Sequence, residues 1–132
     1  TPILVTQKRK YPKVTPSFTV TPTENLGKVQ TVTTPAQFPG GIDQLDDFIK
    51  KNIQYPESAL KKNIEGTVLI SFTITKDGYH RDYKILKGLS LDCDDEVLRV
   101  IKKSPNWQPA IDHDQAVAVQ EIVSVEFKLT DN

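Results

Sequence analysis

The stretch from Gly66 to Gly88 constrains the fold most, because its first half alternates apolar and polar residues before the chain turns back. The apolar positions of this alternation are Val68, Ile70, Phe72 and Ile74, and mostly serine and threonine stand between them. Alternation with a period of two over eight residues is typical of a strand with one buried face. The sequence therefore predicts a half-buried strand that begins near Gly66.

A hairpin should follow this strand. Asp77-Gly78 supplies residues that tolerate the positive φ angles of a tight turn. On the return strand Tyr83 and Ile85 can share one face, which places His80 and Asp82 on the other. A hairpin alone is only marginally stable in water, so the rest of the chain must cover its apolar face.

Helical periodicity predicts that cover. Apolar residues between Ile42 and Ile53 recur at spacings of three and four, and the helix should end before Pro56. A short second helix is expected from Glu57 to Lys62. A third is expected from Asp92, as its N-cap, to about Lys103.

The pattern from Ala116 to Leu129 is that of a strand again, with the odd-numbered residues from Val123 onward forming the core face. A strand–helix–strand connection is normally right-handed and makes its two strands parallel. The first hairpin strand then lies between the other two. We therefore expect an α+β fold of order αββαβ, with a three-stranded antiparallel sheet of strand order 2-1-3 and two main helices on one face.

In this arrangement the last strand is an edge of the sheet. A long edge strand is a pairing hazard unless something covers it or uses it. The expected edge is the strongest functional indication that periodicity alone provides.

The chain of 132 residues is expected to form one domain and a tail. Prolines recur through residues 1–34, which favours an extended, basic linker, and the domain should cover residues 35–132. Within the tail, the short β-rich pieces Phe18–Val20 and Val29–Val32 could pair with something as edge strands.

Charge and composition exclude several classes of function. Residues 1–34 contain five Lys or Arg and one Glu, whereas the remainder contains twelve Lys or Arg and sixteen Asp or Glu. A net-acidic domain argues against nucleic-acid binding, which needs a basic face. The sequence has no apolar run long enough to cross a membrane and no Met, so we expect a further segment to precede Thr1.

No set of residues points to catalysis, a metal or a cofactor. His80 and His113 lie far apart in the sequence without further ligands at metal spacing. Acidic neighbours disfavour the thiolate of Cys93, and Trp107 is expected to fill the core. A small enzyme would need a convergent polar cleft, and none can be identified in the sequence, so we expect a protein without enzymatic activity.

Several short motifs together resemble the C-terminal domain of TonB proteins over roughly residues 36–129. The motifs are Phe38-Pro39-Gly40-Gly41, Tyr55-Pro56, Gly66-x-Val68-x-x-x-Phe72, Asp77-Gly78, Leu91-Asp92, Pro105-x-Trp107-x-Pro109 and Val125-x-Phe127. The Phe-Pro-Gly-Gly motif is similar to the branch of the family that is common in Bacteroidetes-type bacteria. His80 and Tyr83 depart from the family pattern, which has smaller or aliphatic residues there.

The resemblance implies a periplasmic domain of an energy transducer that is anchored in the inner membrane through a segment preceding Thr1. Such a domain binds the TonB box peptide of TonB-dependent outer-membrane transporters as an added strand and passes on energy from the proton gradient. The missing N-terminal helix would contact inner-membrane proton-channel proteins.

The resemblance also implies the contact residues. Tyr55 and Pro56 lie where the family contacts transporters, although Tyr55 could equally fasten the helix end to the core. The last strand is where the family accepts the TonB box, here through Glu121, Ile122, Val123, Ser124, Val125, Glu126, Phe127 and Lys128. Strand addition of this kind uses main-chain hydrogen bonds for affinity and side-chain pockets for selection.

Two questions stay open at the level of the sequence. TonB-like domains also occur at the ends of membrane-bound sensor or peptidase-like receptors, where they would serve as periplasmic binding modules. The residues before Thr1 would distinguish this alternative from a transducer. Whether two copies pair as a homodimer through their edge strands is also undetermined.

Overall fold

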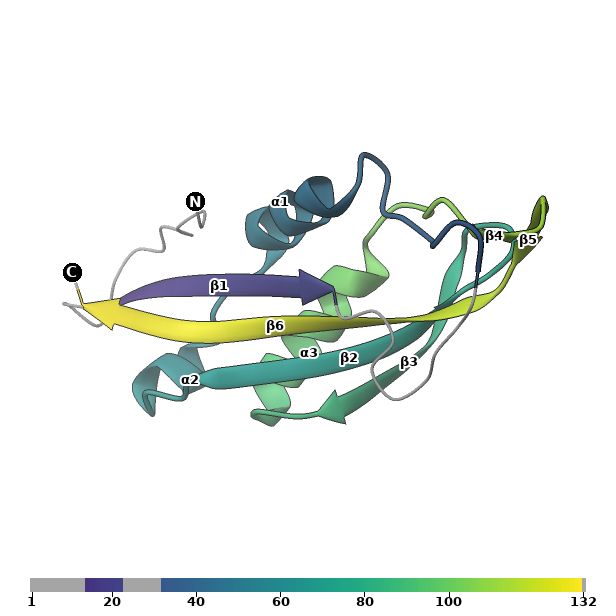
Figure 1. Ribbon diagram of the computed structural model, residues 1–132. Coiled ribbons are helices and arrows are strands. Elements are labelled where there is room, and N and C mark those ends of the chain that lie inside the picture. Colours follow the sequence, from purple (N-terminus) through teal and green to yellow (C-terminus); the bar gives the residue numbers. More distant parts are fainter. Residues whose placement is uncertain (1–13, 23–31, 132) are drawn as a thin grey trace.

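A computed structural model describes residues 14–22 and 32–131 (Figure 1); for 14–22, 130 and 131 the description is limited to the backbone. The elements in chain order are β1 (Val14–Pro22), α1 (Ile42–Asn52), α2 (Glu57–Lys61), β2 (Gly66–Ile74), β3 (His80–Lys87), α3 (Leu91–Lys102), β4 (Ala110–Asp112), β5 (Gln115–Val117) and β6 (Val119–Asp131). None of the helices in these residues is long and apolar enough to cross a membrane.

The main sheet has four strands in the order β1-β6-β2-β3, and every neighbouring pair is antiparallel. The three strands expected from the sequence are β2, β3 and β6, and their predicted order is confirmed. Helix α3 lies behind β6, β2 and β3 in the view of Figure 1. The small hairpin β4–β5 extends from one end of the sheet, just before β6.

The expectation that the last strand is an edge is wrong. Strand β6 pairs with β2 on one side and with β1 on the other. β1 contains the Phe18–Val20 piece, whereas residues 29–31 of the other β-rich piece lie outside the described residues. Threonine, valine and phenylalanine suit an edge strand, and an edge strand also tolerates the prolines of this segment.

The core lies between the sheet and the helices. In the β2–β6 ladder Val68 is opposite Val125 and Ile70 is opposite Val123, and all four side chains are fully buried. From the helices the buried residues include Leu45, Ile49, Val97 and Ile101. The odd-numbered face of β6 from Val123 to Phe127 is thus the core face, as expected.

The turn between β2 and β3 is longer than a two-residue hairpin. It spans residues 75–79, where Gly78 N donates to Thr75 O at 2.9 Å and Thr75 N donates to Tyr79 O at 2.8 Å. Gly78 has a φ of 89°, but Asp77 does not take a positive φ. Only the glycine therefore supplies the conformation that was expected of both residues.

Strand β3 departs from simple alternation. The β2–β3 register shifts twice, and Asp82 has a φ of 58°. This irregularity brings His80 onto the same side as Tyr83, where both rings approach Phe72. The prediction that these two side chains face opposite ways is therefore wrong, because a bulge breaks the period of two.

Helix α3 is capped two residues earlier than expected. Its N-cap is Ser90, whose Oγ accepts a hydrogen bond from Cys93 N at 3.2 Å. Asp92 lies inside the first turn, where its charge suits the positive end of the helix dipole. The predicted cap at Asp92 is thus corrected to Ser90.

Candidate partner-binding site

The expected docking strand is paired along both edges over most of its length. Val123 to Asp131 of β6 lie opposite Pro22 to Val14 of β1, while Val119 to Phe127 lie opposite β2. Among the strands in the described residues, the stretch from Val119 to Ile122 pairs with β2. An extended peptide could add to β6 beyond Ile122 only where β1 now lies.

The side chains of β6 divide between the two faces of the sheet. Val123, Val125 and Phe127 are buried against the helices, whereas Glu126 and Lys128 are exposed on the opposite face. Ser124 is half-buried on that second face. The main chain and this second face are the parts of β6 that a partner could contact.

Two predicted site residues at the start of β6 are buried. Glu121 is 7% exposed and lies opposite Phe72, and Ile122 is 6% exposed and lies opposite Ser71. Neither side chain is available to a partner in this conformation. Their sequence position in the strand predicted contact, but a strand position does not determine exposure.

Tyr55 is a core residue in this structure. Its side chain is 2% exposed, and its ring meets Phe127 edge to face with centroids 5.3 Å apart. Its hydroxyl donates a hydrogen bond to Ile64 O. Burial, followed by the nearby charges of Cys93 and Glu65, raises the pKa of this phenol.

Tyr55 therefore ties the connection between α1 and α2 to the middle of the sheet. This agrees with the alternative interpretation of Tyr55 from the sequence, in which it fastens the helix end to the core. Pro56 follows in an extended conformation, with φ −60° and ψ 140°, and remains half-buried.

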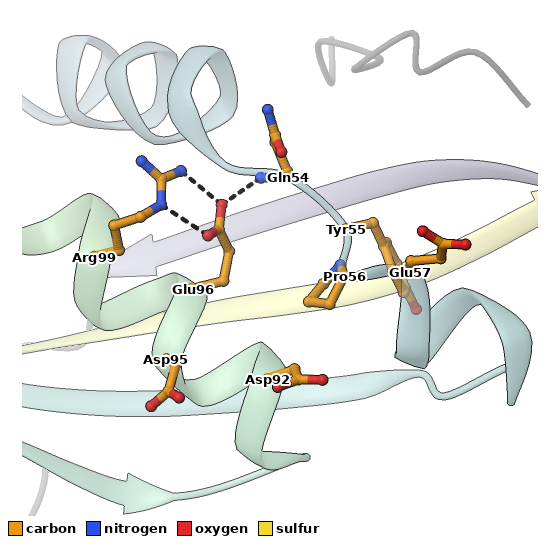
Figure 2. Close-up of a pocket in the computed structure, with 8 residues that line it drawn as sticks. All are labelled: Gln54, Tyr55, Pro56, Glu57, Asp92, Asp95, Glu96 and Arg99. Atoms are coloured by element: carbon orange, nitrogen blue, oxygen red, sulfur yellow. Dashed lines mark hydrogen bonds and ion pairs between the residues drawn. The ribbon is translucent and has the colours of Figure 1, made fainter.

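A pocket of about 600 Å³ opens beside Pro56 (Figure 2). The connection between α1 and α2, the start of α2 and the first three turns of α3 form its walls. The lining residues are Gln54, Tyr55, Pro56, Glu57, Asp92, Asp95, Glu96 and Arg99. Four carboxylates and one guanidinium line it, so the pocket is negatively charged. Figure 2 shows β6 passing behind Tyr55.

An ion pair closes one wall of this pocket. Arg99 donates from Nε to Glu96 Oε1 at 2.8 Å and from Nη2 to Glu96 Oε2 at 2.7 Å. Glu96 Oε2 also accepts from Gln54 N at 2.7 Å, and Arg99 Nη2 donates to Asn52 O at 2.7 Å. The hydrogen bond to Glu96 raises the pKa of Arg99.

These contacts fix α3 to the α1–α2 connection and keep Pro56 at the pocket rim. Sequence reasoning assigned the acidic start of α3 to the helix dipole and did not find the pocket. The sequence shows an acidic first turn in one helix and a Tyr-Pro break after another. Neither feature indicates that the two segments lie next to each other.

No metal or nucleophilic centre is present among the residues described. They contain no group of three or more His, Cys, Asp or Glu side chains that could hold an ion. The Cys93 thiol is fully buried, and burial is the main cause that raises its pKa. The groups that the described site offers to a partner are its carboxylates, its guanidinium and its main-chain donors and acceptors.

Comparison with known proteins connects the chain to one family. Residues 51–129 match the family described as Gram-negative bacterial TonB protein C-terminal. The solution structure of the Helicobacter pylori TonB C-terminal domain is 28% identical, with a TM-score of 0.45, covering 61% of this chain and 86% of that chain. A search of curated proteins gives no match.

Proposed function

Because the chain belongs to the family of TonB C-terminal domains of Gram-negative bacteria, whose members are non-enzymatic periplasmic interaction domains, we propose that it binds the TonB box of outer-membrane transporters. Binding takes place by addition of the peptide as a strand along β6. The domain then transmits energy derived from the proton gradient to the transporter for substrate import.

The observation that carries this proposal is the geometry of the β6 edge. From Val123 onward this edge accepts an antiparallel extended segment, which in the described structure is β1. The main-chain groups of β6 that pair with this nine-residue strand could pair in the same way with an extended peptide in its place. Exposed Glu126 and Lys128 would select among peptides by charge.

The Tyr55-Pro56 region is proposed as a second contact. Buried Tyr55 holds the rim, and the half-buried Pro56 and the carboxylates of the pocket face solvent on the side of the helices. A transporter segment with basic residues would complement this charge.

The remaining parts of the proposal concern the whole protein. Anchoring in the inner membrane and contact with proton-channel proteins would require a segment that precedes Thr1. While β1 is seated, pairing of two copies as a homodimer would use the outer edge of β1 or β3, since β6 lies between β1 and β2. Light scattering at several concentrations measures this association.

Titration of the protein with a synthetic TonB box peptide, followed by amide chemical shifts, tests the peptide contact. We expect shifts along Val123–Lys128 and around Pro56, with weak affinity because an extended peptide loses entropy when it is ordered. The matched control is the same peptide with N-methyl groups on alternate amides, which keeps its side chains but loses donors along one edge.

The methylation pattern is decisive. One of the two alternate patterns should abolish binding, because only one set of amides faces β6. Equal binding of both methylated peptides, or shifts confined to other elements, would contradict strand addition at β6.

A further inference from the structure

Strand β1 occupies the β6 edge in a regular way. Its nine residues run antiparallel to β6 from Val14 opposite Asp131 to Pro22 opposite Val123, with no shift of register. The β2–β3 ladder, in contrast, shifts twice. Figure 1 shows β1 lying along the C-terminal half of β6. A segment more than a hundred positions away in sequence is thus seated as a complete added strand.

This strand covers the part of β6 that the proposed function assigns to the transporter peptide. Val123 to Lys128 lie opposite residues of β1, and the other edge of this stretch pairs with β2 as far as Phe127. A peptide cannot use the same main-chain groups while β1 holds them. One of the two must leave, or the peptide must add outside β1.

Addition outside β1 is the poorer option. Pro16 and Pro22 of β1 have no N–H, and alternate residues of a strand present their N–H groups to the same edge. Proline in a sheet normally turns its nitrogen away from the neighbouring strand. The outer edge of β1 therefore lacks two donors, whereas β6 has no proline from Val119 to Asp131.

We propose that β1 is a displaceable, built-in occupant of the β6 edge, and that an incoming extended peptide replaces it strand for strand. The identity of that peptide as a TonB box rests on the proposed function. The exchange of β1 itself does not.

The seated β1 strand protects the β6 edge and lowers the apparent affinity of this edge for a peptide. While β1 is seated, β6 offers no free ladder to other chains. A peptide that needs the emptied edge binds with an apparent Kd equal to its intrinsic Kd divided by the fraction of molecules in which β1 has left. Occupancy by β1 thus weakens the apparent affinity of every peptide, so that only a peptide with a low intrinsic Kd binds.

A disulfide lock in the full chain tests the exchange. Thr19 and Glu126 are opposite each other in the β1–β6 register, so Thr19→Cys with Glu126→Cys should form a cross-strand disulfide. Cys93 stays in place because it is fully buried. The control is the same protein after reduction, which shares both substitutions and differs only in the link.

A second variant opens the edge instead. Thr19→Pro with Val20→Pro removes adjacent N–H groups, which face opposite edges, so at least one donor toward β6 is lost. Its matched control carries Asn25→Pro with Leu26→Pro, which adds the same two prolines after β1 has ended. Two probes are titrated by amide shifts: a TonB box peptide, and a synthetic peptide with the sequence of residues 14–22.

If β1 is a displaceable occupant, the 14–22 peptide at millimolar concentration shifts the Val123–Lys128 amides of the opened variant and leaves the oxidised lock unchanged. The TonB box peptide should bind the opened variant about tenfold or more tightly than the control, which corresponds to roughly nine-tenths occupancy by β1. The TonB box peptide should also bind the disulfide-locked variant only after its disulfide has been reduced.

Other outcomes separate the two proposals. Equal binding of the TonB box peptide to oxidised and reduced lock would overturn displacement and leave the transporter function standing with a different contact. Exchange of the 14–22 peptide without binding of any TonB box peptide would support displacement and overturn the transporter function. Failure of the 14–22 peptide to shift β6 in the opened variant would overturn displacement.

Discussion

Gly78 is held between a backbone turn and the chain around Trp107. Its φ is 89°, its carbonyl oxygen accepts from Trp107 N at 2.8 Å, and an added Cβ would lie 2.2 Å from Trp107 O. We expect Gly78→Ala to lower the free energy of unfolding by at least about 3 kcal/mol, because left-handed strain adds to a clash with rigid backbone. Urea denaturation measures the change.

Gly41 provides the matched control for this substitution. It has nearly the same φ of 92°, but nothing lies within 4 Å of the position of an added Cβ. With a ψ of −169°, Gly41 lies in a region that glycine almost alone populates, so Gly41→Ala should cost only this backbone strain, about 1–3 kcal/mol. Equal losses in the two variants would show that the approach of Trp107 has no energetic consequence.

Tyr55 links stability to pH. Its pKa is raised mainly by burial, and burial raises the pKa of Tyr83 as well. Above pH of about 10 the unfolded chain loses phenol protons that the folded chain keeps, so the unfolded state binds fewer protons. The free energy of unfolding is therefore expected to be unaffected by these groups below about pH 10 and to fall as the pH rises above it.

Tyr55→Phe tests this linkage. The variant should lose about 1–2 kcal/mol at neutral pH, because Ile64 O loses its donor, and should show a shallower decline above about pH 10. Urea unfolding at several pH values measures both effects. Tyr79→Phe is the control, since Tyr79 is 59% exposed and should change little. An unchanged alkaline slope in the Tyr55 variant would refute the assignment.

At the scale of the element, the start of α3 depends on one hydroxyl. Ser90→Ala removes the acceptor for Cys93 N and should cost about 1 kcal/mol, whereas Ser90→Asp should retain most of the stability because aspartate also caps well. Thermal unfolding followed by circular dichroism compares the two. An unchanged melting temperature in Ser90→Ala would mean that the Ser90 hydroxyl does not cap the helix.

Local patterns predicted those elements whose side chains repeat with a fixed period. The alternation of Val68, Ile70 and Phe72 identified β2, and the apolar spacing from Ile42 identified α1, because both periods follow from the geometry of the chain. Strand order then followed from the handedness of the connection. The fold class required nothing more.

The β3 bulge and the pocket contacts do not follow from a repeating pattern of apolar residues. The bulge in β3 comes from the positive φ of Asp82, which a non-glycine residue adopts only in a particular context. The wall of the pocket joins Gln54 to Glu96 and Arg99 to Asn52, pairs that are 42 and 47 positions apart. Tertiary packing brings such residues together, and the sequence shows only that each has a suitable polar group.

At the scale of the whole molecule, the composition of residues 1–34 did not show whether this segment is a linker or a strand of the sheet. Proline and threonine between residues 1 and 34 favour extended chain, but extended chain is compatible with both a linker and an edge strand. The structure places Val14–Pro22 in the sheet. Its partner β6 lies more than a hundred positions further along the chain, and a local pattern does not identify a partner at that distance.

The two edges of the sheet are protected in different ways. On β3 the bulge and the exposed charged residues Arg81, Asp82, Lys84 and Lys87 oppose strand addition. On the other side β1 carries two prolines, Pro16 and Pro22. The β3 edge is fixed by its hairpin to β2, whereas β1 is joined to the sheet from a distant part of the chain. Opening of the sheet should therefore begin at β1.

Native-state amide hydrogen exchange can detect this order of opening. We expect the β1 amides to exchange with an opening free energy well below that of global unfolding, whereas the β2 amides exchange only through global unfolding. Along Val123–Lys128 of β6 the protection should alternate, because successive N–H groups face β1 and β2 in turn. The β1-facing amides should share the lower value of β1 itself. Uniform protection of β6 at the global value would mean that β1 opens only when the whole sheet does, which would make it a permanent strand of the domain and remove the basis for its exchange with a peptide.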